Sequence, residues 1–419
     1  MEILQNLSLI LALLFAACCG YQLIYVLLPF LIRRCPQRRA EPHSFAVLIC
    51  ARNEEAVIGE LIDSLHGQTY DQRLLQIFVM ADNCTDGTAP AARAAGAAVY
   101  ERFDRVHVGK GYALEALLER IAADYSNGFD GYFVFDADNL LAPDYIERMN
   151  EVFSGGHEIV TGYRSSKNFG GSWVSAGHSL WFLRESAFLN HPRSLIGSSC
   201  AISGTGFLFS RRVLDEQGGW PFHLLTEDLQ FTAHHVLSGR RVGYAPDAIL
   251  YDEQPTTLTQ SMRQRIRWAR GSLQVIRRYG RRLALGAAGG SFSCFDMLMA
   301  AFPAVVFNLA SILCNAALTV AGLFEGLGIR AFVPALTSLG MMTGGFFLMG
   351  AVTMLSEWKR IDLPAAKKLL YMLTFPLFML TYVPVSLVSL LPCRIEWKPI
   401  IHHSVRNCNP PCAKRQNAL

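Results

Sequence analysis

Charged residues are scarce in this sequence. They make up 17% of its 419 residues, whereas soluble globular chains carry about 25%. Hydrophobic residues account for 51% of the chain. This composition excludes an intrinsically disordered protein and argues against a purely soluble one. The length suggests two or three structural units.

The common glycine-rich phosphate loops are missing as well. The sequence contains no G-x-x-x-x-G-K-[ST] motif, and Gly109-Lys-Gly111 is too short to form one. No G-x-G-x-x-G follows the first strand-like apolar run. A P-loop protein and a dinucleotide-binding fold are therefore excluded, and any bound phosphate group has to be held in another way.

Cysteine patterns that would build a disulfide scaffold or a zinc site are also lacking. The eleven cysteines are spread along the chain, and Cys408-Asn-Pro-Pro-Cys412 has no second Cys/His pair at a zinc-site distance. Cys18 and Cys19 lie inside an apolar run. We expect most of these thiols to be small buried hydrophobic groups.

Four long segments carry no charge at all. They run from Ile3 to Ile32 and over 297–324, 331–356 and 369–393. Each is long enough for a spanning helix, which needs about 20 apolar residues. Buried helices of a soluble protein are the alternative, but three successive runs near one end favour spans. Glu2 is the only early charge, which predicts an uncleaved anchor instead of a signal peptide.

Basic residues flank these segments. The first segment is followed by Arg33, Arg34, Arg38 and Arg39. They predict a cytoplasmic catalytic half in a multi-pass protein of the plasma membrane, and the basic loop 357–368 agrees. One anchor and three spans, however, would place the tail after Cys393 on the non-cytoplasmic side, although the tail is basic. Either one segment re-enters the same side, or the charge rule fails here.

Three apolar runs between the anchor and about residue 255 resemble buried strands. They are Phe45–Ala51, Leu75–Ala81 and Gly131–Phe135, and helical patterns separate them. Such alternation predicts an α/β domain with a parallel sheet covered on both faces. Each run ends in acidic or amide residues, and ligands bind at the carboxyl edge of such sheets.

Asp136-Ala-Asp138 is the acidic pair after the third run. Two carboxylates one residue apart can reach one hard cation. Mg²⁺ or Mn²⁺ bound in this way keeps positions open for substrate phosphate oxygens. The pair therefore predicts a metal site at the end of this strand.

A basic helix is predicted between Gln260 and Arg282. It carries eight arginines and no acidic residue. Its apolar stripe comprises Met262, Ile266, Ala269, Leu273 and Ile276. This pattern indicates a helix in the membrane interface. Nucleic acid is not expected as a partner, because no stacking aromatic residues are interleaved.

The ordered motifs resemble those of the membrane-embedded family 2 glycosyltransferases, which include the cellulose, hyaluronan and poly-N-acetylglucosamine synthases. The resemblance covers roughly 45–270. The matching segments are Asn53-Glu-Glu55, Asp82, Lys110-Gly-Tyr-Ala-Leu114, Asp136-Ala-Asp138, Ser203-Gly-Thr-Gly206, Thr226-Glu-Asp228 and Gln264-Arg-Ile-Arg-Trp268. Their order, with the final Q-x-x-R-W, makes the resemblance specific.

The resemblance implies a Rossmann-like GT-A domain, α-helical membrane segments, and inverting transfer from a nucleotide sugar, with UDP as the expected nucleotide. The nucleotide sugar would contact Ala51, Asn53, Glu54, Asp82, Lys110 and Asp136. Asp136 and Asp138 would hold Mg²⁺ or Mn²⁺. Asp228 would be the general base, with Glu227 beside it. The diphosphate and the acceptor would contact Gly204, Thr205, Gln264, Arg267 and Trp268.

Elementary geometry supports several of these roles. A general base has to lie near the acceptor oxygen, on the face opposite the leaving group. Neighbouring helical side chains point about 100° apart, so only one of Glu227 and Asp228 is expected to reach the acceptor. Thr226 is expected to cap their helix through its side chain. Arg267 offers a guanidinium for the charge that develops on the leaving diphosphate.

Two motif segments keep a second interpretation. Trp268 offers a flat apolar face to a sugar ring, or it anchors the interface helix. Ser203-Gly-Thr-Gly206 lets backbone approach the acceptor closely, or it forms a tight turn before the strand-like Phe207–Phe209.

The expected organisation is an anchor (1–32), a GT-A domain (43–255), amphipathic interface helices (256–290), about three C-terminal spans (291–393) and a basic tail (394–419). The expected acceptor is a growing polysaccharide or oligosaccharide, with the bilayer itself as a partner. The main alternative is one sugar added to a membrane lipid. An inactive nucleotide-sugar-binding scaffold is opposed by the intact Asp136, Asp138, Asp228 and Arg267.

Overall fold

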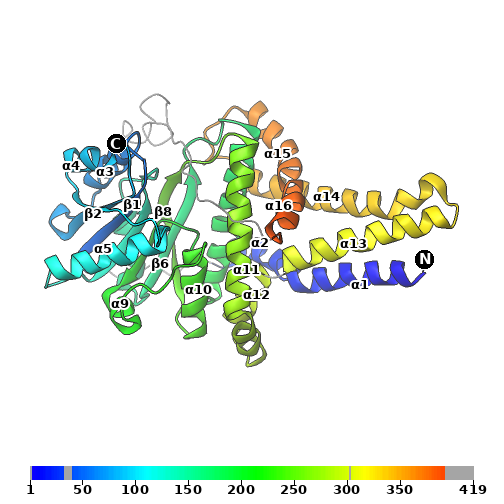
Figure 1. Ribbon diagram of the computed structural model, residues 1–419, viewed down its shortest axis with the longest axis horizontal. Coiled ribbons are helices and arrows are strands. Elements are labelled where there is room, and N and C mark those ends of the chain that lie inside the picture. The colour runs from blue at the N-terminus through cyan, green and yellow to red at the C-terminus, as the bar shows by residue number, and fades with distance from the viewer. Residues whose placement is uncertain (1, 33–39, 302, 392–419) are drawn as a thin grey trace.

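The computed structural model describes residues 2–32, 40–301 and 303–391. The predictions that concern the arginines at 33–39, the tail 394–419 and Cys408 with Cys412 lie outside these ranges. Figure 1 shows a body built around a β-sheet, with long helices that extend from one side of it.

The sheet of the described residues has eight strands in the order β3-β2-β1-β4-β7-β6-β8-β5. The strands are β1 (Phe45–Ala51), β2 (Leu75–Asp82), β3 (Ala98–Arg102), β4 (Gly131–Asp136), β5 (Leu140–Leu141), β6 (Ile159–Ser166), β7 (Phe207–Ser210) and β8 (Val242–Asp252). The three predicted runs are confirmed as the neighbouring parallel strands β2, β1 and β4. β7 runs antiparallel to both β4 and β6.

Helices cover both faces of this sheet, as the continuous apolar runs predicted. One face is covered by α3 (Ile58–His66), α4 (Thr88–Ala94) and α6 (Tyr145–Ser154), and the other by α5 (Lys110–Asp124), α9 (Arg211–Gln217) and α10 (Glu227–Leu237). Alternate residues of β1 enter the two cores: Val47 packs with the first group and Leu48 with the second. Burial on both sides explains why the strand has no polar face.

The predicted interface segment forms one long helix, α11 (Leu258–Ala288), followed by α12 (Phe292–Ala301). Its buried stripe differs from the expected apolar one and consists of Ser261, Arg265, Gly271, Val275, Tyr279 and Leu283. The expected stripe is only half-buried. The reason is that α11 packs against α10, α12 and α16, so its protein-facing side includes small and polar residues as well as apolar ones.

The described chain contains three segments that are long and apolar enough to cross a membrane: Leu9–Leu31, Gly328–Ser356 and Ala365–Ser389. A shorter apolar helix covers Leu309–Phe324. The helices involved are α1 (Glu2–Cys19), α2 (Gln22–Leu31), α13 (Pro303–Phe324), α14 (Val333–Ser356), α15 (Ala365–Leu380) and α16 (Tyr382–Ser389). In Figure 1, α1, α13 and α14 extend together from the body, whereas α15 and α16 stay beside it.

Two arginines of α11 hold α15 and α16 at the body. The Arg265 guanidinium lies 4.5 Å from the Phe378 ring centre and 4.7 Å from that of Tyr382. Arg270 donates to the carbonyl oxygens of Ser389 at 3.2 Å and Leu391 at 2.6 Å. A cation at a helix C-terminus is favourable because the last carbonyls have no partner within the helix.

The packing of α15 on α7 (Trp173–Glu185) depends on one glycine. A Cβ at Gly177 would lie 2.3 Å from Phe378 Cγ, so Gly177→Ala should overpack this contact and destabilise the protein by about 1–3 kcal/mol. Gly59→Ala in α3 is the control, because no atom lies within 4 Å of its new Cβ. It should stabilise by about 0.5–1 kcal/mol. Thermal unfolding in detergent measures both, and an unchanged Gly177→Ala midpoint would contradict the packing argument.

Candidate active site

Lys110, at the start of α5, joins the end of β4 to the Ser203–Gly206 turn. Its Nζ donates to Asp136 Oδ1 at 2.5 Å and to the Gly204 carbonyl oxygen at 2.7 Å. Burial works against the charged lysine, but the carboxylates of Asp136 and Glu227 outweigh it and raise the pKa of Lys110 to about 12. The structure therefore brings together three motifs that lie far apart in the sequence.

A glycine next to this lysine permits the close approach of α5. A Cβ at Gly111 would lie 2.0 Å from the Phe222 carbonyl oxygen. Because backbone cannot be displaced as a flexible side chain can, a larger residue would push the start of α5 away from the segment that leads into α10.

The two carboxylates of the Asp136-Ala-Asp138 pair differ in environment. The Asp136 side chain is 37% exposed, whereas Asp138 is buried and accepts a bond from the Glu253 backbone N–H at 3.3 Å. Asn139 bridges Asp138 and Asp252, donating to each at 3.4 Å. Within the described ranges, no group of three or more His, Cys, Asp or Glu side chains could hold a metal ion.

Glu227 and Asp228 begin α10 on the other side of Lys110. Burial raises the pKa of Glu227 to about 7, and the neighbouring Asp228 charge adds to the effect, whereas Lys110 and Arg267 oppose it. Burial also raises the pKa of Asp228, while backbone N–H groups, Lys110 and Arg267 lower it. Gly204 faces this pair, since a Cβ there would lie 3.9 Å from Asp228 Oδ2.

The predicted capping role of Thr226 is wrong. Thr226 occupies the position before α10, but its side chain makes no capping bond, and its buried hydroxyl has no partner among the described residues. Gly271 of α11 packs directly against it: a Cβ at Gly271 would lie 2.5 Å from the Thr226 hydroxyl oxygen. The start of α10 is thus positioned by contact with α11.

The Q-x-x-R-W residues reach the site to different degrees. Arg267 donates to the Leu225 carbonyl oxygen at 3.2 Å, just before the acidic pair. The Gln264 side-chain oxygen is buried and has no hydrogen-bond partner in the described part of the chain. The Trp268 ring lies against α7, with ring centres 5.8 Å from His178 and 5.9 Å from Phe182.

The motif residues at the ends of β1 and β2 form a second group. The Asn53 side chain donates to Thr85 Oγ1 at 3.1 Å, and the backbone at Asn53 is left-handed, with φ 59°. The Glu54 backbone N–H donates to Thr88 Oγ1 at 2.8 Å. The buried Ala51 ends β1, and its carbonyl oxygen accepts from Cys84 Sγ at 3.4 Å.

Asp82 has a basic partner that the motifs did not indicate. Arg102 lies opposite Asp82 in the β2–β3 ladder and donates to its Oδ1 from Nη1 at 2.7 Å. Arg102 Nη2 also reaches Asp104 at 3.0 Å and the His107 carbonyl oxygen at 2.8 Å. The arginine therefore links Asp82 to the loop before Lys110.

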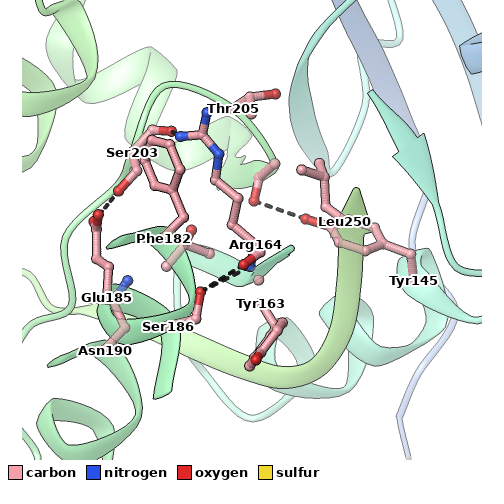
Figure 2. Close-up of a pocket in the computed structure, with 13 residues that line it drawn as sticks. Tyr145, Tyr163, Arg164, Phe182, Glu185, Ser186, Asn190, Ser203, Thr205 and Leu250 are labelled. Carbon is pink, nitrogen blue, oxygen red and sulfur yellow. Dashed lines mark hydrogen bonds between the residues drawn. The ribbon is translucent and has the colours of Figure 1, made fainter. Parts of the chain in front are cut away.

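A second missed pair supports the Ser203–Gly206 turn from behind, beside a small cavity (Figure 2). Arg164 donates to the Ser203 carbonyl oxygen at 2.6 Å and forms an ion pair with Asp252. The Ser203 hydroxyl donates to Glu185 from α7. Gly204 and Gly206 have φ of 80° and 67°, so the tight-turn interpretation of this segment holds together with its approach to Asp228. Asp252 also ends an apolar strand, a signal that could have identified it.

Sequence comparisons give relatives of two kinds. The chain is 25% identical over 383 residues to the β-monoglucosyldiacylglycerol synthase of Synechocystis sp., covering 85% of this chain and 74% of the relative. It is 26% identical over 246 residues to the poly-β-1,6-N-acetyl-D-glucosamine synthase of Staphylococcus aureus, covering 57% of each. The chain spans about half the length of several other curated relatives, namely 56% of one and 54% of two.

A solved structure and a family model agree with these relatives. The mannosyltransferase PcManGT from Pyrobaculum calidifontis, in complex with GDP-Man and Mn²⁺, superposes with a TM-score of 0.59 at 19% identity, covering 92% of this chain and 98% of that one. This likeness confirms the predicted GT-A fold. The model described as "Glycosyltransferase like family 2" matches residues 42–271, more than half of the chain. The chain therefore belongs to the glycosyltransferase-like family 2, as the order of its motifs predicted.

Proposed function

We propose that this chain is a membrane-bound inverting glycosyltransferase that moves one sugar from a nucleotide sugar, with UDP as the first nucleotide to test, to a hydroxyl group of a membrane lipid. The observation that carries the reaction is the position of Asp228. It begins α10 beside the Gly204 backbone, and the charges of Lys110 and Arg267 act on its carboxylate.

In the proposed step, the Asp228 carboxylate takes the proton of the acceptor hydroxyl. The acceptor oxygen then forms a bond to the anomeric carbon of the sugar, and the bond from that carbon to the diphosphate oxygen breaks. The nucleoside diphosphate leaves with the electron pair. Lys110 and Arg267 would stabilise the negative charge that develops on it.

The donor set at the end of β4 fits a divalent cation. Asp136 and Asp138 supply two hard oxygen ligands, and Mg²⁺ commonly uses one or two carboxylates together with water and substrate phosphates. A bound Mg²⁺ or Mn²⁺ would neutralise charge on the diphosphate. The related PcManGT structure contains Mn²⁺.

The acceptor side of the site is formed by helices that also carry the apolar segments. Arg267 belongs to α11, which packs on α16. The neighbouring α7 packs on α15. A hydroxyl presented at the membrane surface would therefore approach Asp228 along these helices. The similarity to the Synechocystis glycolipid synthase extends over 85% of the chain, well beyond the family 2 domain at 42–271, which favours a lipid acceptor.

The helix arrangement also supports a membrane topology. We infer that α1–α2, α13 and α14 cross the bilayer, while α15 and α16 remain on the cytoplasmic side with the catalytic domain. α13 has 22 residues and a length of about 33 Å, enough for a hydrocarbon core of about 30 Å. Three crossings would place the basic tail in the cytoplasm, which removes the conflict in the charge pattern.

Elongation of a saccharide polymer is the second candidate. It is favoured by the similarity of the catalytic half to the Staphylococcus aureus poly-N-acetylglucosamine synthase. That similarity covers 57% of the chain, so it supports the reaction more than it supports the acceptor.

The first experiment uses the full chain in lipid vesicles with a panel of labelled UDP- and GDP-sugars and Mg²⁺ or Mn²⁺. We expect a single labelled sugar to enter the organic phase. A labelled product in the aqueous phase that grows in length with time would establish the polymer candidate.

Asp228→Asn should lower transfer at least 100-fold and leave nucleotide binding intact, because general-base catalysis typically contributes about 10²–10⁴-fold. Normal turnover by this variant would disprove the base assignment.

Asp138→Asn tests the metal site. The variant should bind UDP more weakly in the presence of Mg²⁺ and equally well without it, because the amide replaces a charged ligand. Isothermal titration with and without the metal measures this difference. Asp124→Asn, at the far end of α5, is the matched control. Metal-dependent binding of wild-type strength in Asp138→Asn would contradict the assignment.

The pH profile tests the coupling of Glu227 and Asp228. Burial raises the pKa values of both carboxyl groups, and the Asp228 charge raises that of Glu227 further, so activity should fall on the acidic side of the profile at a higher pH than for an ordinary aspartate. Glu227→Gln removes the negative neighbour, so Asp228 should lose its proton more readily and the acidic limb should move to lower pH. UDP release as a function of pH measures the limb. An unchanged limb, or one at higher pH, would exclude this coupling.

A further inference from the structure

A groove lies between the last turns of α10 and α11 and the beginning of α12. It has a volume of about 400 Å³, and its apolar lining includes Val236, Leu237, Leu285 and Cys294. Arg282 contributes the charged group of the lining. An apolar channel with a guanidinium in its wall suits a molecule that has a hydrocarbon part and an anionic group.

The groove is distant from the reaction centre. Asp228 and Leu237 lie at opposite ends of α10, nine residues apart, which corresponds to about 14 Å along the helix. Arg267 and Arg282 are fifteen residues apart on α11, which corresponds to about 22 Å. The groove is therefore separate from the acceptor site, although it shares two helices with it.

The surroundings of the groove are strongly basic. The last turns of α11 expose Arg277, Arg278, Arg281 and Arg282. The sequence contains no acidic residue between Glu253 and Asp296, and Asp296 is buried in an ion pair with Arg193. The arginines next to the groove consequently present a positive field to any ligand that approaches it.

The position of α11 fixes the source of such a ligand. In Figure 1, α11 runs across the direction of α1, α13 and α14, so it would lie along the membrane surface if these helices cross the bilayer. Leu285 at the groove is 63% exposed, and Phe292 at the start of α12 is 42% exposed. Apolar side chains beside a row of arginines are typical of a helix at the lipid headgroup level.

We infer that this groove binds an anionic phospholipid. The lipid phosphate lies at Arg282, and one acyl chain of the same lipid packs against the apolar lining. The inference rests on the proposed membrane association, but not on the identity of the acceptor. Val236 and Leu237 line the groove at one end of α10, and Asp228 lies at the other end. The bound lipid would fix the contact between α10 and α11, and thereby the position of Asp228 relative to Arg267.

The test compares the full chain in vesicles of phosphatidylcholine alone with vesicles that also contain phosphatidylglycerol. UDP release reports turnover, and maleimide labelling of a Leu285→Cys variant, mapped by mass spectrometry, reports occupancy of the groove. Phosphatidylglycerol should raise turnover and slow the labelling. Arg282→Gln should require about fivefold more phosphatidylglycerol for half of either effect, since one surface arginine contributes about that factor.

Arg120→Gln is the matched control, because this exposed arginine lies on α5, away from α11. It should respond to phosphatidylglycerol as the wild type does. Vesicle flotation tests membrane association separately from lipid binding in the groove. All variants should float with both lipid mixtures, because their apolar helices insert into the vesicles. A protein that does not float would contradict the proposed membrane association.

Three results would overturn the lipid site in a protein that does float. Turnover and labelling could be equal in the two lipid mixtures, or Arg282→Gln could respond as the wild type does. Alternatively, inorganic phosphate with phosphatidylcholine vesicles could protect Leu285→Cys as well as phosphatidylglycerol does, which would identify a site for free anions.

Discussion

The interaction of Lys110 with the carboxylates around it determines much of the remaining site. Asp136, Glu227 and Asp228 converge at one edge of the sheet, and burial together with the neighbouring Asp228 charge raises the pKa of Glu227. Lys110 supplies the opposite charge at their centre, and Arg267 adds a second positive charge from α11. Without them, the acidic groups would take up protons or move apart, and α10 would lose its position relative to β4.

Lys110 and Arg267 have to lie near the acidic groups, and this requirement explains why α5, α10 and α11 approach one another so closely. Gly111 allows α5 to contact the backbone before α10, and Gly271 allows α11 to contact Thr226 at the start of α10. Glu227 is buried and Asp228 is half-buried in this region, and reduced contact with water strengthens the electrostatic interactions there. The buried Gln264 side-chain oxygen, which has no hydrogen-bond partner among the described residues, lies in the same α11 segment.

The catalytic domain could be predicted largely from the sequence, because its strands are continuous apolar runs that end in polar motifs. β1, β2 and β4 form where these runs occur, and Asp82 and Asp136 lie at the same edge. The partners Arg102 and Arg164 could not be predicted, since their acids come from other strands and only the sheet topology makes them neighbours. Thr226 was predicted wrongly because local capping preference does not anticipate packing by Gly271 of α11, 45 residues later in the chain.

The placement of the apolar helices could be predicted less well from the sequence. Composition identifies apolar segments, but it does not reveal which of them stay against the catalytic domain. Arg265 and Arg270, which decide this for α15 and α16, belong to the segment that was predicted to lie in the membrane interface. A guanidinium can bind a phosphate, cap a helix or stack on an aromatic ring, and the periodicity of α11 does not distinguish these uses.

The two halves of α11 therefore lie in different environments, one inside the protein and one at its surface. Its first half directs Arg267 toward the acidic pair and Arg265 and Arg270 toward α15 and α16, whereas its last turns expose four arginines beside the groove. The helix is continuous from the residues that contact α10 to its basic end. In the proposed function, this continuity would couple the position of Asp228, the proposed base, to the membrane surface. This coupling suits an enzyme whose acceptor is presented by the membrane.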